Sequence, residues 1–343
     1  MDKIAVVILN WNGKELLNKY LPSVVKFSNG SGISIYLADN FSDDESISYV
    51  SNTFPSVKIL ELDKNYGFAE GYNIALKDIE AEHYILLNSD IEVTKDWFEP
   101  LLNCMESQPD VAACMPKIIS DEKRDEFEYA GAAGGYIDKY GFPFCRGRLF
   151  NMNEKDTGQY NYSSEIFWAT GACMMIRADL FHRAGGLDKD FFAHMEEIDL
   201  CWRLKNQGYK IYYCHESTVY HLGGGTLKKT NPRKTYLNFR NNLFLIYKNA
   251  APEKVNKMLF IRFIIDGIAA IKFLFSFEFT NFVSVFKAHV SFYSKLKIFR
   301  PKRRQNLKSF KIFKHKEIYK KSIVYSFFVK KIKKFSDLKF DNY

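Results

Sequence analysis

The chain has 343 residues, of which 47% are hydrophobic, and a formal net charge of +9. This length allows one large α/β domain with an appendage, or two ordinary domains, and the apolar content excludes a disordered chain. The charge is uneven, because residues 287–343 contain 18 Lys and Arg against three acidic residues, a local balance of +15 that leaves −6 for the rest. A basic segment on an acidic globule predicts contact with an anionic surface.

The cysteines and the first residues indicate the expected compartment. The six cysteines show neither Cys-x-x-Cys spacing nor a zinc pattern, which favours reduced, buried thiols in a cytosolic protein. The apolar run from Ile4 to Leu9 is too short for a signal peptide. We therefore expect a protein that is not exported.

Strands and helices alternate in the first part of the chain. Apolar runs predict strands at residues 3–9, 33–38, 57–62 and 84–87, and helices at residues 14–27 and 69–79. This alternation predicts a doubly wound, mainly parallel α/β sheet with right-handed crossovers. Each strand ends in Asn or Asp, at Asn10, Asp39, Asp63 and Asn88. Turn chemistry explains one or two such residues, but four at one edge of a sheet indicate a nucleotide site.

The phosphate-binding motifs of other nucleotide enzymes are absent. Neither Gly-x-Gly-x-x-Gly nor Gly-x-x-x-x-Gly-Lys-Ser/Thr occurs, so bound phosphates would need a metal and polar side chains. Asp90, at the end of the strand that leads into Asn88-Ser89-Asp90, is a carboxylate able to hold a hard divalent cation. Taken alone, the same three residues are more often those of a turn and helix cap, and the rest of the chain reverses that preference.

The second half of the predicted domain is less regular. A helix is expected at residues 96–107, strands at 111–115, 173–176, 209–214 and 218–220, and a helix from 191 to 207 that Gly208 terminates. Residues 120–165 are rich in Gly and Tyr and predict hairpins and a mobile loop lining an acceptor groove.

Three acidic residues lie within one predicted helical turn, at Glu196, Glu197 and Asp199. Arg203 follows Asp199 by four residues, which favours an ion pair along the helix. Glu196 and Glu197 point about 100° apart on a helix and so cannot share one role. Neighbouring aromatic residues would raise the pKa of a carboxyl toward the range of a general base. A solvated acidic face fits this pattern equally well.

In order and spacing, several stretches resemble the family-2 inverting glycosyltransferases of the GT-A fold, in particular their bacterial rhamnosyltransferase-like branch. The matching stretches are residues 6–13, 38–44, 65–73, 86–90, 170–172, 196–203 and 221. The resemblance covers about residues 3–250. It implies a GT-A sheet with a C-terminal helical extension and transfer of a sugar from a nucleotide diphosphate donor.

The resemblance also implies roles for residues of the donor site. Asp39 matches the residue that contacts the nucleobase, with Asn10 and Asn12 near the same nucleoside. Asn65, Gly67 and Asn73 match the segment beneath the ribose and diphosphate, and Asn88 and Ser89 complete the donor-binding set.

Asp90 resembles the last residue of the family's Asp-x-Asp metal motif, with Asn88 in place of the first Asp. His221 resembles a later diphosphate- or metal-contacting His, so the implied cofactor is Mg²⁺ or Mn²⁺ held by Asp90 and His221.

Where the family has Glu-Asp-x-Asp, this chain has Glu196-Glu197-Ile198-Asp199, which assigns the catalytic base to Glu197 and leaves Glu196 as the alternative. Trp168, Asp199 and Arg203 are expected to contact the acceptor or support this turn.

The C-terminal third predicts a membrane contact. We expect a catalytic domain at residues 1–230, helices in the membrane interface at 231–300 and a basic tail at 301–343. Charged residues interrupt the aromatic stretch 258–299, so a transmembrane helix is not expected. The alternative is an intramolecular helical pair with a solvated tail. A nucleic-acid-binding tail is disfavoured because the aromatics form an apolar face, and no nucleic acid partner is predicted.

The sequence as a whole predicts a glycosyltransferase of cell-surface polysaccharide synthesis, cytoplasmic and peripheral on the inner face of the cell membrane. Its partners would be a nucleotide diphosphate sugar, a glycan or lipid-linked acceptor, and the membrane surface. The alternative is a non-catalytic nucleotide-sugar-binding or scaffold protein of the same fold.

Overall fold

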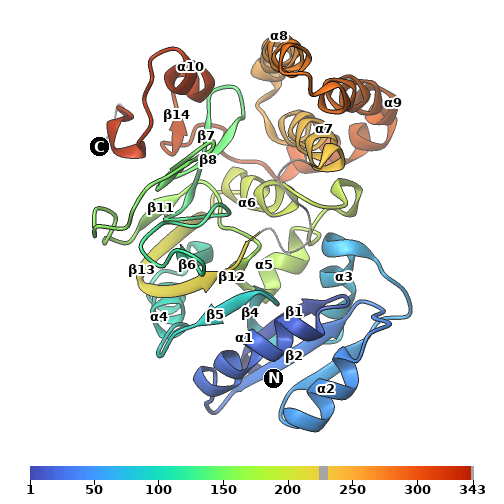
Figure 1. The fold of residues 1–343 in the computed structure, drawn as a ribbon, viewed down its shortest axis with the longest axis vertical. Coiled ribbons are helices and arrows are strands. Elements are labelled where there is room, and N and C mark those ends of the chain that lie inside the picture. Colours follow the sequence, from blue (N-terminus) through green and yellow to red (C-terminus); the bar gives the residue numbers. More distant parts are fainter. Residues whose placement is uncertain (224–230, 341–343) are drawn as a thin grey trace.

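The computed structural model describes residues 1–223 and 231–340, and the expected domain boundary at residue 230 lies outside them (Figure 1). The strands of the main sheet are β1 (Asp2–Asn10), β2 (Ile33–Asp39), β3 (Lys58–Glu61), β4 (Ala81–Asn88), β5 (Ile91–Val93), β6 (Val111–Ser120), β11 (Ser164–Ile166), β12 (Cys173–Arg177) and β13 (Lys210–His221). They form a nine-stranded sheet in the order β11-β13-β6-β12-β4-β1-β2-β3, with β5 paired to β13.

The first half of this sheet is parallel, as the sequence predicts. Strands β3, β2, β1 and β4 pair in parallel. The helices of this half are α1 (Lys14–Phe27), α2 (Ser46–Thr53) and α3 (Gly67–Ala75). Strand β12 runs antiparallel between β4 and β6, so the sheet is mixed beyond this point. Parallel strands are buried on both faces, which explains the unbroken apolar runs of β1 and β4.

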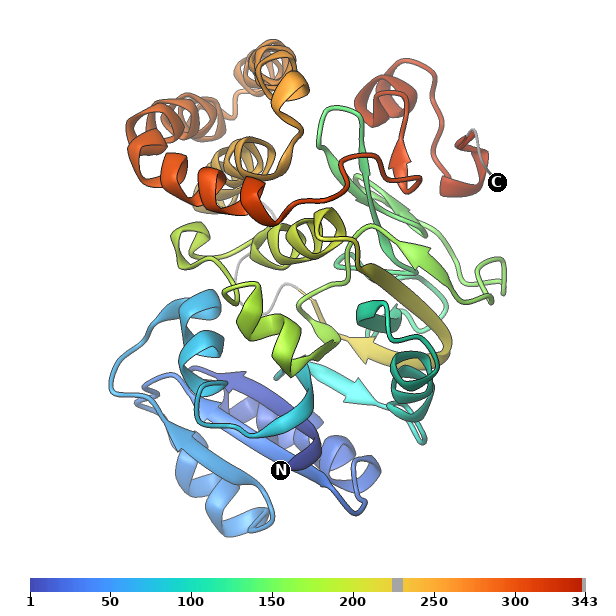
Figure 2. The same ribbon diagram turned by 180° about the vertical axis from the view of Figure 1, so that it is seen from behind.

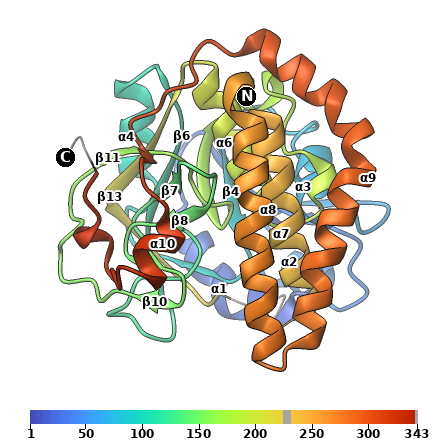
Figure 3. The same cartoon turned by 90° about the horizontal axis from the view of Figure 1, so that it is seen from above.

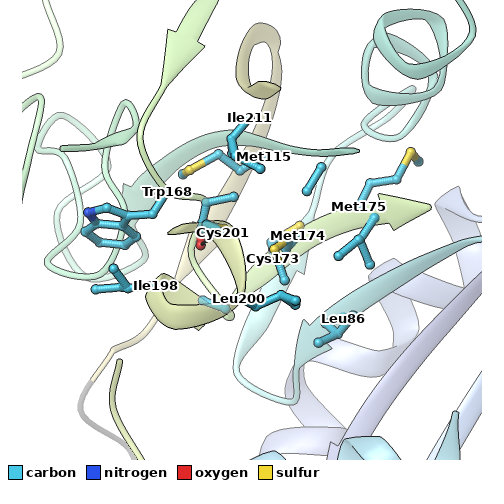
Figure 4. Close-up of a cluster of buried hydrophobic side chains, with 14 of the residues drawn as sticks. Leu86, Met115, Trp168, Cys173, Met174, Met175, Ile198, Leu200, Cys201 and Ile211 are labelled. Carbon is cyan, nitrogen blue, oxygen red and sulfur yellow. Dashed lines mark hydrogen bonds between the residues drawn. The ribbon is translucent and has the colours of Figure 1, made fainter. Parts of the chain in front are cut away.

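The second half of the sheet is covered by α4 (Glu99–Ser107), α5 (Ala178–Arg183) and α6 (Glu196–Asn206). Figure 4 shows Leu200 and Cys201 of α6 directed at Cys173 and Met174 of β12. All four side chains are fully buried. Packing of this kind fixes α6, and with it the acidic turn, against the sheet.

Two predicted elements differ from the structure. The helix expected from residue 191 begins only at Glu196, because Phe192, His194 and Met195 adopt left-handed backbone conformations with φ of 69–77°. The two strands expected at 209–214 and 218–220 are a single strand, β13, with an irregularity between Cys214 and Thr218. A bulge preserves strand pairing while interrupting the alternation of side chains, which is why the pattern reads as two strands.

Residues 120–165 and the C-terminal segment build a second sheet together. It has the order β10-β9-β8-β7-β14, with β7 (Gly135–Asp138), β8 (Pro143–Cys145), β9 (Arg148–Leu149), β10 (Met152–Asn153) and β14 (Ile318–Tyr319). Beyond β14 lies α10 (Ile323–Phe328), and Figure 2 shows this C-terminal part beside β7 and β8. The segment expected as a basic tail is therefore folded onto the domain from Ile318 onward, with Phe327 and Phe335 buried.

The remaining helices form a layer of their own, α7 (Pro232–Asn249), α8 (Pro252–Phe275) and α9 (Phe279–Ser309). Seen from above, α8 and α9 form a long hairpin beside α7 (Figure 3). Helix α9 continues past the boundary expected at residue 300. Within residues 1–223 and 231–340, no helix combines the length and apolar character needed to span a membrane.

Candidate active site

The polar strand ends meet at one edge of the sheet. In the pairing of β1 with its neighbours, Asn10 lies opposite Asp39 and Leu9 lies opposite Asn88. The segment after β3 joins them, because the backbone N–H of Leu62 donates to the carbonyl of Asp39 at 2.8 Å. The four strand ends are therefore neighbours, at the carboxyl edge where open α/β sheets bind ligands.

Asp39 is held in a closed network at this edge. Its Oδ1 accepts from Asn10 Nδ2 at 3.0 Å and from the Ser42 hydroxyl at 2.6 Å, and its Oδ2 accepts from the Ser42 backbone N–H at 2.8 Å. Asn12 fixes the same loop, because its Oδ1 accepts from the Asp43 backbone N–H at 2.9 Å. Asp39 is only 1% exposed, so a nucleobase would reach it only after Ser42 gives way.

A second asparagine network orders the predicted donor segment. Asn65 Oδ1 accepts from the backbone N–H of Gly67 at 2.8 Å and from Asn40 Nδ2 at 3.1 Å. Asn40 also accepts from the Tyr66 backbone N–H at 2.8 Å, a role that the analysis of strand ends did not assign to it. Asn73 does not point to this network, since its amide exchanges two hydrogen bonds with the backbone of Leu187.

The predicted metal pair is brought together across the sheet. His221 Nε2 lies 3.1 Å from Asp90 Oδ1, and both residues are buried. Backbone pairing explains the contact, because β5 pairs with β13 and the N–H of Leu222 donates to the carbonyl of Asp90. On its other side, His221 Nδ1 lies 3.1 Å from Glu128 Oε2. Glu128 comes from the irregular 120–165 region, where no sequence pattern singled it out.

The two carboxylates set the charge of this histidine. Burial alone would lower the pKa of His221, but hydrogen bonds to Asp90 and Glu128 raise it to about 10. For Asp90, burial by itself would raise the pKa, but the hydrogen bond and the charge of His221 lower it below its usual value. The imidazolium therefore stands between two carboxylates at neutral pH.

The residues fit a divalent cation only in part. Asp90 and His221 offer one oxygen and one nitrogen donor, a set that suits Mn²⁺ and, less well, Mg²⁺. No group of three His, Cys, Asp or Glu side chains is arranged as a complete metal site within the described part of the chain. Binding also requires His221 to lose its proton, since a ligating imidazole is neutral. The pair thus fits a metal that takes its other ligands from a bound diphosphate and water.

A short segment links these strand ends to the acidic turn. The N–H of Asn88 donates to the carbonyl of Ala172 at 2.9 Å, while Ser89 continues into the turn before β5. A Cβ at the neighbouring Gly171 would lie 3.2 Å from the Phe68 ring of α3 and 3.7 Å from Glu197 Cβ. Gly171 is therefore in contact with the donor side and with the acidic turn at once. A larger residue there would separate the two.

The two glutamates of the turn have different environments. Glu196 is buried and its Oε2 has no hydrogen-bond partner, and burial followed by the charge of Glu197 raises its pKa well above the usual value. Glu197 is partly exposed, and burial raises its pKa to about 7. Burial thus favours the protonated form of Glu196, while Glu197 is poised near neutral pH between its two forms.

The loop before this turn is strained and clamped. Phe192, His194 and Met195 have positive φ angles, which are costly for side chains of this size. Asn241 of α7 donates through Nδ2 to the carbonyls of Phe191, Ala193 and His194 at 2.8–3.0 Å. Its buried neighbour Arg240 donates to the Phe191 carbonyl at 2.9 Å and to Asn241 Oδ1. Sequence periodicity gives no sign of this clamp, because its acceptors are backbone atoms.

The expected supporting residues are all held inside the fold. Asp199 is fully buried and pairs with Arg203 at 2.8 Å and Lys248 at 2.7 Å, and it also accepts from Asn249. These contacts tie α6 to α7. Trp168 packs over Gly135, where a Cβ would overlap the indole, and its Nε1 donates to the Tyr136 carbonyl at 3.0 Å. Burial of this kind is that of structural support.

Comparison with known proteins identifies the family of this site. Residues 5–185 match the model for glycosyl transferase family 2. A low-salt glycan biosynthesis hexosyltransferase, Agl10 of Haloferax volcanii, is 22% identical over 284 residues, 80% of this chain and 86% of that protein. An N-acetylglucosaminyl-diphospho-decaprenol L-rhamnosyltransferase of Mycobacterium tuberculosis is 23% identical over 236 residues, 64% of this chain and 76% of that protein.

Solved structures show the same fold at low identity. GalNAc-T7 with UDP, GalNAc and Mn²⁺ aligns with a TM-score of 0.55 and 18% identity over 72% of this chain, which spans 48% of that structure. The mannosyltransferase PcManGT of Pyrobaculum calidifontis, in complex with GDP-Man and Mn²⁺, aligns with a TM-score of 0.52 and 12% identity over 90% of this chain and 84% of that one. The predicted GT-A fold is thereby confirmed. Because the family model covers more than half of its residues, this chain belongs to glycosyl transferase family 2.

Proposed function

We propose that this protein transfers a sugar from a nucleotide diphosphate sugar to a hydroxyl group of a glycan or lipid-linked acceptor, with inversion of the anomeric carbon. The observation that carries the proposal is Glu197, a half-buried residue whose Oε2 is buried without a hydrogen-bond partner among the described residues, and whose pKa burial raises to about 7. It lies in contact range of Gly171, next to the strand ends that match the donor site. The relatives named as hexosyl- and rhamnosyltransferases of glycan synthesis support the same reaction class.

In this mechanism Glu197 removes the proton of the acceptor hydroxyl while its oxygen attacks the anomeric carbon. The new bond forms on the face opposite the leaving nucleoside diphosphate, whose bond to the sugar breaks, so that the configuration inverts. Glu196, whose buried position favours its protonated form, would support the turn rather than take part in the reaction. Asn10, Asn12 and Asp39 would hold the nucleoside, and the segment from Asn65 to Gly67 would pass beneath the diphosphate.

Asp90 and His221 are the residues that we propose to hold the metal. A bound Mn²⁺ or Mg²⁺ would neutralise charge that develops on the diphosphate as it leaves. Two structural neighbours contain Mn²⁺ together with a nucleotide or a nucleotide sugar, which supports this choice. The proposed acceptor places the protein at a membrane surface, peripheral on its inner face, where a lipid-linked substrate would be reached.

The first experiment is a donor screen. Nucleoside diphosphate release is followed from a panel of UDP-, GDP- and dTDP-sugars, with Mn²⁺ or with EDTA. We expect metal-dependent release from one donor. No release from any donor, together with no thermal stabilisation by UDP, GDP or dTDP plus metal, would instead favour the non-catalytic scaffold.

The metal role has a matched pair of variants. Asp90→Asn is expected to weaken both donor binding and the response to Mn²⁺, because it removes the carboxylate next to His221. Glu92→Gln, two residues along, removes a carboxylate that pairs with Arg124 on the surface and should leave both unchanged. An unaltered Mn²⁺ response in Asp90→Asn would exclude this residue as a ligand.

A further inference from the structure

Helices α8 and α9 bury several charged side chains and expose large apolar ones. Arg262 and Asp266 of α8 are 2% and 1% exposed, and they pair with each other at 2.9 Å. His289 of α9 approaches Asp266 to 3.1 Å. On the outer side of the same hairpin, Phe275 and Phe277 are 79% and 81% exposed. A helix pair in water normally buries its apolar face, so this arrangement indicates a non-aqueous surrounding.

The exposed apolar side chains form continuous stripes at helical spacing. Those of α8 are Phe260, Ile264, Ile268, Ile271 and Phe275, and those of α9 are Phe279, Val283, Phe286, Val290 and Tyr293. The sequence suggested that charged residues interrupt this segment. Arg262 and Asp266 face inward, away from the outer surface, whereas Lys272 and Glu278 are exposed toward its end at the α8–α9 turn. We call this surface the apolar stripe.

The apolar stripe of α9 is followed toward the C-terminal end of the helix by basic residues, which lie on either side of Pro301. After Tyr293, the next positions at the same spacing are Lys297, Arg300 and Arg304, and Arg300 and Arg304 have no acidic partner within the described residues. Helix α9 contains no Asp or Glu in its 31 residues. Helix α9 thus combines exposed apolar side chains with exposed basic ones, as helices that lie on anionic membranes do.

A pocket of about 320 Å³ lies at this basic end, lined by Tyr247, Arg300, Arg303, Arg304 and Leu307. Arg303 is itself buried and donates to the carbonyls of Tyr247 and Ala250 at the end of α7, which fixes the floor of the pocket. The other two arginines keep their guanidinium groups available. Arginine clusters of this kind match the oxygens of a phosphate group.

We propose that the apolar stripe lies among the acyl chains of an anionic bilayer and that the pocket of Arg300, Arg303 and Arg304 binds the phosphate of a lipid headgroup. This inference deepens the membrane contact in the proposed function. A second copy of the chain is a poorer occupant, because the facing α9 would bring no carboxylate to these arginines. A bilayer supplies both the hydrocarbon and the negative charge.

The test is sedimentation with vesicles of phosphatidylcholine, with or without phosphatidylglycerol. This assay measures binding without catalysis, so its result is independent of whether the proposed transfer reaction is correct. We expect the protein to prefer the anionic vesicles. Arg300→Gln/Arg304→Gln should weaken that binding roughly tenfold or more, given about 1 kcal/mol per basic residue near such a surface. Ile268→Gln/Phe286→Gln should weaken binding to both kinds of vesicle.

Matched controls come from outside the hairpin. Lys26→Gln/Lys77→Gln makes the same charge change on exposed residues of the N-terminal half of the domain, and Met152→Gln makes the polarity change on an exposed residue of β10. Both should bind like the wild type. All substituted side chains are exposed, so circular dichroism should show intact folding.

Three results would overturn the proposal. The first is absence of vesicle binding, or binding that the arginine variant leaves unchanged. The second is a dimer in size-exclusion chromatography that Ile268→Gln/Phe286→Gln disperses, which would assign the stripe to a second copy. The third is binding of inorganic pyrophosphate that depends on Arg300 and Arg304 without a preference for anionic vesicles, which would assign the pocket to a soluble phosphate.

Discussion

The parallel half of the sheet and the α8–α9 hairpin place apolar and polar side chains in opposite ways. Strands β1 and β4 bury their apolar runs and end in Asn10 and Asn88 at the ligand edge. The hairpin buries Arg262 and Asp266, and it exposes Phe275 and Phe286 while Phe292 and Phe299 stay buried. The difference is that the sheet hides its apolar side chains from water, whereas the hairpin leaves an exposed apolar surface, on which the proposed membrane contact rests. The acidic turn of α6 lies between them, clamped by α7.

The largest effect is expected from substitutions in the acidic turn of α6, which lies between the sheet and the helical layer. Glu197→Gln should lower kcat by about 10²–10⁴-fold while donor binding persists, because general-base assistance is lost. Glu196→Gln is the matched control, and since burial raises the pKa of Glu196 and so favours its neutral form, this variant should change the rate far less. Steady-state kinetics and donor titration separate the two effects. Equal losses in both variants would move the base assignment to Glu196.

The connection between α6 and α7 is tested by the buried ion cluster. Asp199→Asn leaves Lys248 and Arg203 without their shared carboxylate and should cost about 3–5 kcal/mol of unfolding free energy. Asp179→Asn removes an equally spaced Asp–Arg pair that is exposed on α5, and should cost about 1 kcal/mol or less. Urea unfolding measures both. Similar costs would mean that burial does not distinguish the two pairs.

Substitution of Asn241 tests whether helix α7 positions the acidic turn of the active site. Asn241→Ala removes three hydrogen bonds to the strained loop and should reduce kcat by up to about 10²-fold, with donor affinity kept, because the base loses its position. Asn238→Ala, on the same helix, removes a side chain that makes no hydrogen bond among residues 1–223 and 231–340, and it should behave as wild type. If Asn241→Ala changes only stability, the clamp has no part in positioning.

The pH profile sharpens the role of Glu197. Since its pKa is raised to about 7 and the base acts deprotonated, kcat/KM should rise about tenfold per pH unit below pH 7 and level off above it. Glu197→Asp should retain a sigmoidal profile with a shifted midpoint. A profile that is flat from pH 5 to pH 8 would contradict this assignment.

The smallest expected effect concerns the hairpin alone. A Cβ at Gly267 of α8 meets nothing within 4 Å, so Gly267→Ala should stabilise the protein by roughly 1 kcal/mol through helix propensity. Gly141→Ala is the contrasting variant, since its φ is +77° and its Cβ would lie 2.6 Å from Ile246. Thermal unfolding should show opposite shifts. A destabilising Gly267→Ala would indicate that this position is covered.

Short-range sequence patterns predicted the parallel sheet, the polar strand ends and the family. A strand buried on both faces is a continuous apolar run, and the turn that follows it is made of the next few residues, so both can be recognised locally. The pairing of Asp199 with Arg203 was equally readable, as it depends only on helical spacing. The predicted start of α6 is too early. Phe192, His194 and Met195 adopt positive φ angles, and the carbonyl groups of this loop accept hydrogen bonds from Asn241 of α7, which local sequence patterns do not report.

The sequence by itself therefore determined which elements form, which edge of the sheet is polar and which acidic residues stand in one turn. Tertiary structure decided that Glu128 joins His221, that Asn73 binds Leu187 and that Arg262 and Asp266 face inward. The physical reason is separation along the chain. Periodicity indicates only which face of a single element is apolar. Burial, pKa values and hydrogen-bond partners depend on contacts between elements that lie more than 20 residues apart.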